Sequence, residues 1–258
     1  RECINMDYIT RKSLIYRTNV EYGDYTLNHV LGCSHGCKYP CYAMMLKKRF
    51  GAIKNYDDWI KPRLVRNYKE ILDKELPKLY KKIDNIHLCF TTDPFMYNEP
   101  EIVKASDDIL HMLAEYGIRA SVLTKGVYPK SLLDLPKNFS FGITLISLDE
   151  EFRRNIEPGS APYVKRIASL KKLKQQGFNT WVSIEPYPTP NIIEQDFIKI
   201  LESIRFVDKI IFGKINYNKI ATSYKDRVSF FNNLAYETKQ FCEKNDIEWY
   251  IKNGTINE

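Results

Sequence analysis

Short apolar stretches alternate with longer amphipathic stretches along most of the chain. Short apolar stretches bounded by turn residues are typical of buried strands, and apolar residues three or four positions apart are typical of helices. Strands are therefore predicted at 25–31, 85–90, 119–123, 140–146, 179–184 and 208–212, with a last short strand at 248–251. Helices are predicted at 44–50, 59–82 with a break at Pro77, 101–116, 129–133, 163–176, 192–204 and 226–245.

This alternation predicts an α/β fold with a parallel sheet, because parallel strands need long crossover connections and are buried on both faces. No linker, change in composition or internal repeat divides the six strand–helix units. One domain is therefore expected at 25–258, preceded by an extended polar lead-in at 1–24. Six units fit either a doubly wound sheet or an incomplete barrel.

Polar residues stand where the predicted strands end. In barrels of parallel strands, the residues that carry out chemistry gather at the carboxyl ends of the strands. The sequence therefore predicts an enzyme. The residues are a cysteine-rich loop after the first strand, Thr91, Thr92 and Asp93 after the second, Thr124, Lys125 and Gly126 after the third, Ser147 after the fourth, Glu185 after the fifth and 213–217 after the sixth.

The loop at 32–43 holds three of the six cysteines, Cys33, Cys37 and Cys41. Its glycine, proline and polar residues favour a metal site over a packed core. Cysteine thiolates are the usual ligands of iron–sulfur clusters, and three of them would leave one iron of a [4Fe–4S] cluster open. A zinc site that adds His35 is the alternative, although His35 is close in sequence to two of the cysteines. A disulfide is not expected, because the clustered cysteines are odd in number.

Composition and charge limit the size of the domain, the class of partner and the cellular compartment that we expect. The 258 residues, 44% of them hydrophobic, are enough for one large core. The net charge of +7 is compatible with nucleic acid or another anionic partner. No apolar run approaches the ~20 residues of a membrane span and no signal peptide is recognised, so no membrane partner and a reducing, cytoplasmic setting are expected. The chain begins at Arg1 rather than Met, so residues before Arg1 are expected.

The cysteine loop resembles that of radical S-adenosylmethionine (SAM) enzymes. Its pattern, Cys-x3-Cys-x3-Cys, is one residue longer than the usual Cys-x3-Cys-x2-Cys, with Tyr39 and Pro40 before the third cysteine. The resemblance covers roughly residues 25–215. The segments that resemble the branch containing spore photoproduct lyase are 28–33, 41–43, 91–95 (Thr-Thr-Asp-Pro-Phe) and 153–158, which holds Arg153 and Glu157 before Pro158.

The resemblance implies an incomplete (β/α)6 TIM-type barrel. It also implies one [4Fe–4S] cluster bound by Cys33, Cys37 and Cys41, with SAM on the fourth iron. Reductive cleavage of SAM would give a 5′-deoxyadenosyl radical that acts on an unidentified substrate, in a lyase or another radical reaction. Nucleic acid is left open as that substrate. The expected partner is an electron donor such as flavodoxin or ferredoxin, and the need for a partner protein is left open.

The resemblance also implies contacts to SAM at the strand ends and beside the cysteines. Each residue has an ordinary structural alternative, such as an Asp-Pro turn, a solvated lysine, strand propensity or tyrosine packing. The implied contacts are Tyr39 or Tyr42 with the adenine, Thr91, Thr92 and Asp93 with the amine, Lys125 with the carboxylate, Thr144 and Ser147 with the ribose, and Glu185 with cofactor or substrate.

For other residues near these positions, the sequence predicts surroundings rather than a contact with SAM. His35 is expected to be a donor to a neighbour or to face solvent. Arg153 and Glu157 are expected to pair with each other or clamp the cofactor. Cys89 is expected to point away from the site, since it precedes by one residue the position of the hydrogen-donating cysteine of spore photoproduct lyase. Cys242 is expected in the core, and Cys3 without a role. The competing function is a non-enzymatic zinc-binding module that contacts nucleic acid.

Overall fold

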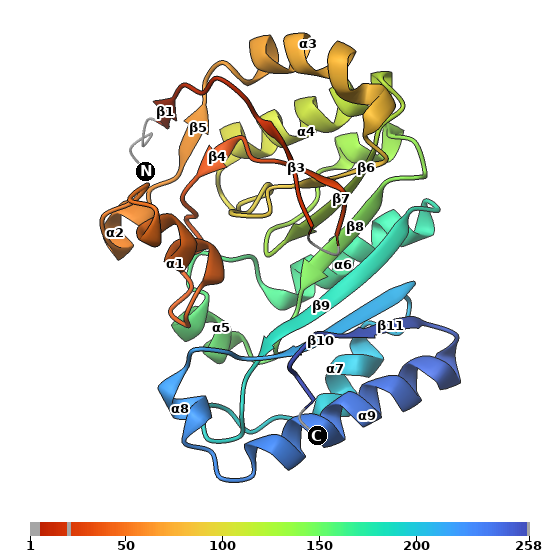
Figure 1. Cartoon of the computed structure of the whole chain (residues 1–258). Helices are drawn as coiled ribbons and strands as arrows, with labels where there is room; N and C mark the ends of the chain where they lie inside the picture. The colour runs from red at the N-terminus through yellow and green to blue at the C-terminus, as the bar shows by residue number, and fades with distance from the viewer. Residues whose placement is uncertain (1–5, 20–21, 257–258) are drawn as a thin grey trace.

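The computed structural model describes residues 6–19 and 22–256, so Cys3 lies outside the described residues. Its main feature is an eight-stranded sheet in the order β11-β10-β9-β8-β7-β6-β3-β2 (Figure 1). Neighbouring strands from β3 to β11 are parallel, and β2 runs antiparallel to β3. The strands are β2 Ile15–Arg17, β3 Tyr25–Leu27, β6 Asn85–Leu88, β7 Arg119–Thr124, β8 Ser140–Thr144, β9 Asn179–Tyr187, β10 Lys209–Lys214 and β11 Glu248–Ile251.

The strand order decides between the two architectures that the sequence allows. From β6 to β11, strands that follow one another in the chain lie next to one another in the sheet. A doubly wound sheet instead reverses its order at a switch point. In the described chain β2 and β11 are the two edges, and no pairing joins them. The predicted incomplete barrel is therefore confirmed.

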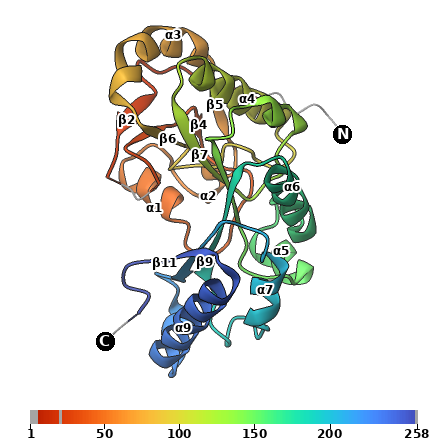
Figure 2. The same ribbon diagram turned by 90° about the vertical axis from the view of Figure 1, so that its right-hand side faces the viewer.

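Helices cover the outer face of the sheet, and Figure 2 shows α4, α6 and α7 along one side of it. Leu110 of α4, Leu170 of α6 and Ile200 of α7 are buried in one core with Val122 and Val182 of the strands. The helices are α1 Tyr42–Arg49, α2 Tyr56–Trp59, α3 Tyr68–Leu79, α4 Pro100–Glu115, α5 Glu150–Ile156, α6 Tyr163–Gln175, α7 Phe197–Ser203, α8 Lys219–Thr222 and α9 Arg227–Asn245, with 3-10 turns η1 Tyr80–Lys82 and η2 Lys130–Asp134.

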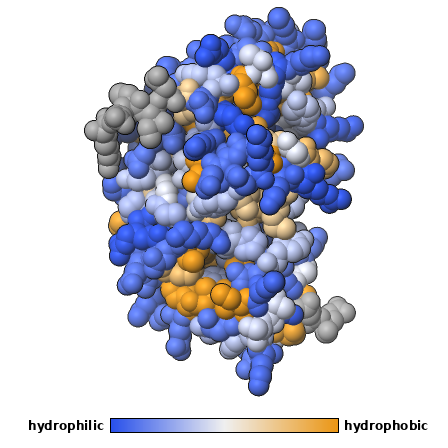
Figure 3. Space-filling view, turned by 90° about the vertical axis from the view of Figure 1, so that its left-hand side faces the viewer, coloured by the Kyte–Doolittle hydropathy of each residue, from blue (hydrophilic) through white to orange (hydrophobic). Residues whose placement is uncertain are grey.

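The surface is largely polar. The side of the molecule that carries α1, α2, α5 and α8 in Figure 1 is mostly hydrophilic in its upper half, and hydrophobic surface gathers lower down (Figure 3). Among the described residues, no helix combines the length and the apolar character that crossing a membrane would require.

The first predicted strand, 25–31, is in fact two short strands in different sheets. β4 Val30–Leu31 belongs to a three-stranded sheet of order β1-β5-β4, with β1 Asp7–Ile9 and β5 Arg63–Val65. The chain changes sheets at Asn28 and His29, whose side chains bond to the Thr91 amide and to the Ser106 hydroxyl. Both β1 and β2 fall in the expected extended lead-in, and they pair with β5 and β3.

Two predicted helices are wrong in extent. The helix at 59–82 is interrupted by β5, because Pro62 cannot occupy a helix interior, and its second part, α3, continues past Pro77 to Leu79. The helix at 192–204 begins only at Phe197, where the Asp196 side chain caps it by accepting the Lys199 amide.

The Trp181 indole on β9 can lie against β8 only because β8 has a glycine, Gly142, at the point of contact. A Cβ on Gly142 would lie 2.4 Å from the ring of Trp181 on β9, which is 5% exposed. The Trp181 ring also stacks on Tyr22, with centroids 5.3 Å apart. The indole therefore lies flat against the backbone of the adjacent strand and fills the barrel interior.

Gly142→Ala is expected to destabilise the protein by about 1–3 kcal/mol, because the added methyl overlaps the Trp181 ring. Urea unfolding followed by circular dichroism measures the loss. The double variant Gly142→Ala/Trp181→Leu is the control, since the smaller side chain makes room for the methyl. Its cost should be less than the sum of the two single costs, and strict additivity would contradict the packing described above.

Candidate functional site

The cysteine loop leaves β4 through a turn that requires glycine. Gly32 has a φ of +91°, and a Cβ there would lie 2.7 Å from the carbonyl oxygen of Trp59. The neighbouring Cys33 amide donates to the same carbonyl oxygen at 2.8 Å. The beginning of the loop is therefore fixed against the end of α2.

The middle of the loop is fixed to the segment around the end of α5. The Lys38 amide donates to the Ile156 carbonyl at 2.8 Å, and the Gly159 amide donates to the His35 carbonyl at 3.0 Å. A Cβ on Gly159 would lie 2.1 Å from the Ser34 carbonyl oxygen, so this close approach also requires glycine. The end of α2 holds the beginning of the cysteine loop, and the segment 156–159 holds its middle.

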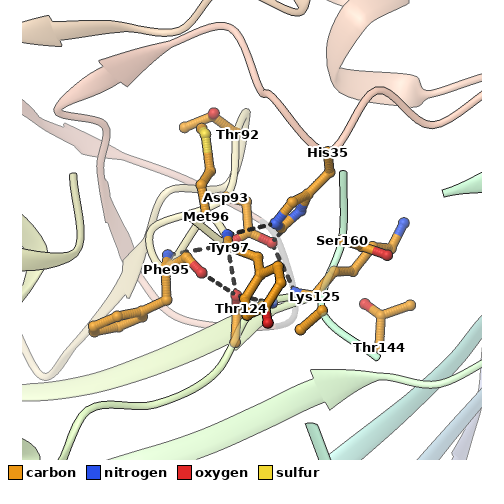
Figure 4. A network of polar contacts seen from close by, with 12 residues as sticks. His35, Thr92, Asp93, Phe95, Met96, Tyr97, Thr124, Lys125, Thr144 and Ser160 are labelled. Atoms are coloured by element: carbon orange, nitrogen blue, oxygen red, sulfur yellow. Dashed lines mark hydrogen bonds and ion pairs between the residues drawn. The ribbon is translucent and has the colours of Figure 1, made fainter. Parts of the chain in front are cut away.

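The Asp93 carboxylate joins the ends of β6 and β7 to this loop (Figure 4). Its Oδ1 accepts hydrogen bonds from the Thr124 hydroxyl at 2.6 Å and the Phe95 amide at 3.0 Å. Its Oδ2 accepts the Lys125 amide at 2.8 Å and lies 3.4 Å from His35 Nδ1. Burial alone would raise the pKa of Asp93, but the His35 ring and these hydrogen bonds outweigh it and lower the pKa from 3.8. Both oxygens are therefore occupied within the protein.

His35 is buried and does not face solvent. Its Nε2 accepts the Tyr97 amide at 3.0 Å (Figure 4), so the ring hydrogen is assigned to Nδ1, on the side of Asp93. The histidine holds the cysteine loop against the end of β6. A zinc site built from three cysteines and His35 would need a free ring nitrogen, and here one nitrogen accepts a hydrogen bond and the other faces a carboxylate.

A second buried carboxylate, Glu157, lies between two cations and a tyrosine. Its Oε1 accepts the Tyr39 hydroxyl at 2.8 Å and lies 3.1 Å from Lys125 Nζ, and its Oε2 lies 2.8 Å from an Arg166 nitrogen. Glu157 and Arg166 are fully buried. Burial alone would raise the pKa of Glu157, but Lys125 and Arg166 outweigh it and lower the pKa to about 2. The carboxylate is therefore ionised over the whole physiological range.

The three loop thiols lie beside this network. Lys125 Nζ is 3.5 Å from Cys37 Sγ. Burial raises the pKa of Cys37 despite the opposing effect of Lys125, raises that of Cys41 to about 11 and raises that of Cys33 well above its usual value. The thiols therefore hold their protons at neutral pH and must release them to bind a metal.

Within the described part of the chain, no three His, Cys, Asp or Glu side chains converge on a point where one ion would sit. In a [4Fe–4S] cluster each cysteine binds a different iron, so its ligands do not have to converge in that way. Three thiols in one loop fit the donor set of a [4Fe–4S] cluster with one open iron.

The other residues expected to contact SAM have varied surroundings. Both the amide and the hydroxyl of Thr91 donate to Asn28 Oδ1, and the Thr92 hydroxyl donates to the Gly32 carbonyl. Tyr39 is buried in the Glu157 network. Tyr42 is 56% exposed and Tyr39 is 8% exposed, so the ring of Tyr42 is the more accessible of the two.

The last three expected contacts lie at the ends of β8 and β9. Thr144 is buried, and its carbonyl accepts a hydrogen bond from Arg166. The hydroxyl of Ser147 accepts the Asp149 amide in the turn before α5. Glu185 Oε2 lies 3.2 Å from Lys252 Nζ, which places this carboxylate with the C-terminal strands rather than in the network around Cys37.

The remaining cysteines are packed in the protein. Cys89 is buried, has a φ of +62° and lies with its Sγ 3.3 Å from His29 Nδ1. The following residue, Phe90, has its ring against Tyr42, with centroids 6.0 Å apart. β6 ends at Leu88, so a turn rather than strand alternation directs these two side chains to different surroundings. Cys242 is fully buried in α9, as expected.

Arg166 is the site residue that the sequence reading missed. It lies on the same face of α6 as the buried residues Tyr163, Leu170 and Leu173. A cation on the apolar face of a helix needs a buried counter-charge, and this was the available signal. The expected pair of Arg153 and Glu157 is wrong: Arg153 binds Glu150 and the Ser160 carbonyl, and Glu157 binds Lys125 and Arg166.

An open cavity of about 640 Å³ gives access to the loop. Cys37 and Tyr39 lie on one wall, and Tyr217, from the loop after β10, lies on another. The carboxyl ends of the first and the sixth predicted strands are therefore brought to one opening. Its lining residues are Cys37, Lys38, Tyr39, Pro40, Met44, Met45, Tyr56 and Tyr217.

A family model described as the radical SAM superfamily matches residues 27–204, well over half of the chain. Two curated relatives are uncharacterized proteins. ORF301 of Acidianus two-tailed virus is 28% identical over 193 residues, which are 70% of this chain and 61% of the viral protein. MJ0683 of Methanocaldococcus jannaschii is 29% identical over 196 residues, which are 74% of this chain and 70% of that protein. The matches thus span 61% and 70% of these relatives.

Solved structures show the same fold at low sequence identity. Spore photoproduct lyase in complex with dinucleoside spore photoproduct superposes with a TM-score of 0.67 at 15% identity, over 94% of this chain and 80% of the lyase. SuiB of Streptococcus suis bound to S-adenosylmethionine superposes with a TM-score of 0.51 at 13% identity, over 70% of this chain and 41% of SuiB.

Glu157→Gln is expected to lower the free energy of unfolding at pH 7 by roughly 3 kcal/mol, because Lys125 and Arg166 lose their shared counter-charge. The pKa of Glu157 is depressed in the folded state, from 4.5 to about 2. Its contribution is therefore complete above pH 4.5 and is lost as the pH falls toward 2. Urea titrations at pH 7, 5, 4 and 3 should show the difference between parent and variant narrowing below pH 4.5.

The matched control is Glu151→Gln on the exposed side of the adjacent helix α5. This change should stay within about 0.5 kcal/mol of the parent. A difference for Glu157→Gln that does not change across the acid range would mean that Glu157 is not ionised in the folded protein.

Proposed function

The chain belongs to the radical SAM superfamily, and we propose that it binds one [4Fe–4S] cluster through Cys33, Cys37 and Cys41 and cleaves SAM reductively. On this proposal the chain acts as a radical SAM enzyme, and the non-enzymatic zinc-binding module is the alternative. The observation that carries the proposal is the placement of three thiols in one fixed loop at the carboxyl edge of the sheet, next to the Lys125–Glu157–Arg166 network.

When bound, a reduced [4Fe–4S] cluster supplies the electron that cleaves SAM to methionine and a 5′-deoxyadenosyl radical. The protein's part is to position the cofactors and exclude water. Asp93 and His35 fix the loop from inside, and Glu157 fixes Tyr39 and Lys125 beside Cys37. These groups are held at strand ends and by buried ion pairs, and the network contacts the Cys37 thiol directly.

The contacts of the described residues indicate which protein groups are available to each part of SAM. Asp93 uses both oxygens within the protein, so we propose that backbone carbonyls near Thr91 and Thr92, rather than the Asp93 carboxylate, accept the SAM amine. Tyr42 is the proposed partner of the adenine, because its ring is exposed. Thr144, Ser147 and Glu185 remain proposed contacts at the ends of β8 and β9.

Lys125 keeps its proposed role at the SAM carboxylate. Its side chain is 15% exposed, and its Nζ already contacts Glu157 and the Tyr39 hydroxyl. Lysine has three donors, and the longest of its three contacts is the one to Cys37 Sγ at 3.5 Å. An incoming carboxylate would replace this contact, so the ammonium can bind it without leaving Glu157. Glu157 and Arg166 then keep the charge balanced on the buried side.

The setting of the proposed reaction follows from the cofactor. We propose one catalytic domain at 25–258 with the lead-in 1–24, a reducing cytoplasm, a flavodoxin or ferredoxin as electron donor, and possible dependence on a partner protein. Nucleic acid is the first substrate class to test, because the chain carries a net charge of +7 and the similar lyase structure contains a dinucleoside. Binding to nucleic acid should weaken steeply as salt rises.

Anaerobic reconstitution with iron and sulfide, followed by dithionite and SAM, is expected to yield 5′-deoxyadenosine that chromatography detects. Cys37→Ala should abolish the product, because a thiol ligand beside Lys125 is lost. Cys242→Ala is the matched control, since this buried cysteine belongs to α9, and it should keep both the iron content and the product.

Metal and sulfide analysis of the same samples shows whether a sample that makes no 5′-deoxyadenosine holds an iron–sulfur cluster or zinc. About four irons with acid-labile sulfide per chain are expected for the parent and the control. About one zinc without sulfide, and no 5′-deoxyadenosine, would refute the proposed function.

A further inference from the structure

Helix α1 begins directly at the cysteine loop, and one face of it, with Tyr42, Met45, Lys48 and Arg49, is exposed. Cys41 is its N-cap residue, and the Cys41 carbonyl accepts the Met45 amide at 3.0 Å. None of the eight residues of α1 is buried. Met45 is 39% exposed, and Phe50, immediately after the helix, is 74% exposed. A helix that leaves such apolar side chains in solvent is a candidate for an interaction surface.

The same part of the chain is uniformly basic. Residues 25–56 include five Lys or Arg and no Asp or Glu. Among the described residues, none of the five takes part in an ion pair. Burial, and to a smaller extent the nearby Arg11, lowers the pKa of Lys47. The five residues are Lys38, Lys47, Lys48, Arg49 and Lys54.

This surface adjoins the thiols. Met44 and Met45 of α1 line the same cavity as Cys37, and Lys38 lies on its rim. Figure 1 shows α1 beside α2 at the edge of the molecule, away from the helices that cover the sheet. A protein bound to α1 would therefore approach the cysteine loop from outside without entering the barrel.

We propose that the α1 surface, made of Lys38, Met45, Lys47, Lys48, Arg49 and Phe50, docks an acidic electron-transfer protein that carries a flavin or an iron–sulfur centre. The proposal rests on the proposed function, because reductive cleavage of SAM needs one electron per turnover. The carrier is oxidised by one electron and the cluster is reduced by one. Positive charge without a counter-charge selects an acidic partner and speeds its encounter.

The composition favours a protein over nucleic acid as the occupant. Methionine, aromatic and arginine side chains are enriched in protein interfaces, and α1 presents Met45, Arg49 and Phe50 together. Phosphate binding depends on charge and needs no apolar centre. Nucleic acid is therefore an outcome that the test must be able to reveal.

The charge-reversal pair Lys48→Glu/Arg49→Glu tests the proposal in the reconstituted full-length protein. Stopped-flow absorbance measures how fast a reduced flavodoxin reduces the cluster at low salt. We expect the rate to fall roughly tenfold or more, and the difference to shrink at high salt as the charges are screened. Lys171→Glu/Lys172→Glu on α6 is the matched control with the same change of charge, and it should keep the parent rate.

Dithionite bypasses the docking surface, so it separates this inference from the proposed function. Both charge-reversal variants should make 5′-deoxyadenosine from SAM and dithionite at the parent rate. If the parent itself makes none, the proposed function fails. If dithionite works and Lys48→Glu/Arg49→Glu is still reduced by flavodoxin as fast as the parent, only the docking surface is refuted.

Carbodiimide cross-linking gives a readout that does not depend on turnover. Flavodoxin carboxylates should be joined to Lys47 and Lys48, as peptide mapping would show, and salt should suppress the cross-link. Cross-links concentrated on other helices would overturn the assignment. So would protection of these lysines from acetylation by an oligonucleotide but not by flavodoxin, since α1 would then be a nucleic acid surface.

Discussion

Two buried carboxylates, Asp93 and Glu157, hold together the segments that build the candidate site. A carboxylate removed from water must be matched by hydrogen-bond donors or cations, or it loses its charge. Asp93 is matched by two backbone amides, a hydroxyl and the His35 ring. Glu157 is matched by Lys125, Arg166 and Tyr39. Each carboxylate thereby links the cysteine loop to residues much later in the chain, Thr124 and Lys125 after β7 or Arg166 on α6.

These two networks meet at one residue. The backbone amide of Lys125 bonds to Asp93, and its side chain reaches Glu157 and lies 3.5 Å from Cys37 Sγ. Lys125, in the turn after β7, therefore contacts both carboxylates and the Cys37 thiol. Because breaking a buried ion pair leaves an uncompensated charge, the arrangement tolerates little change. It is a rigid support for three thiols that a metal cluster can use without first ordering the loop.

The loop is rigid on its inner side and open on its outer side. Tyr39 lies within the buried network, whereas Tyr42, three residues later, lies at the exposed start of α1. The extra residue in the loop, relative to the usual superfamily spacing, falls between these two tyrosines. A single short segment thus supplies a buried anchor, three thiols and the beginning of a basic helix that is open to solvent.

The sequence by itself determined the α/β class, most of the strands and helices, and the loop of three thiols, because these depend on residues close together in the chain. It did not determine which buried charged side chains pair with one another. Arg153 and Glu157 stand four positions apart, yet each binds a different residue, and Arg166 completes the network from the next helix. Only the tertiary structure decided these pairings, since a buried charge selects its partner by distance in space and by the need to leave no charge unmatched.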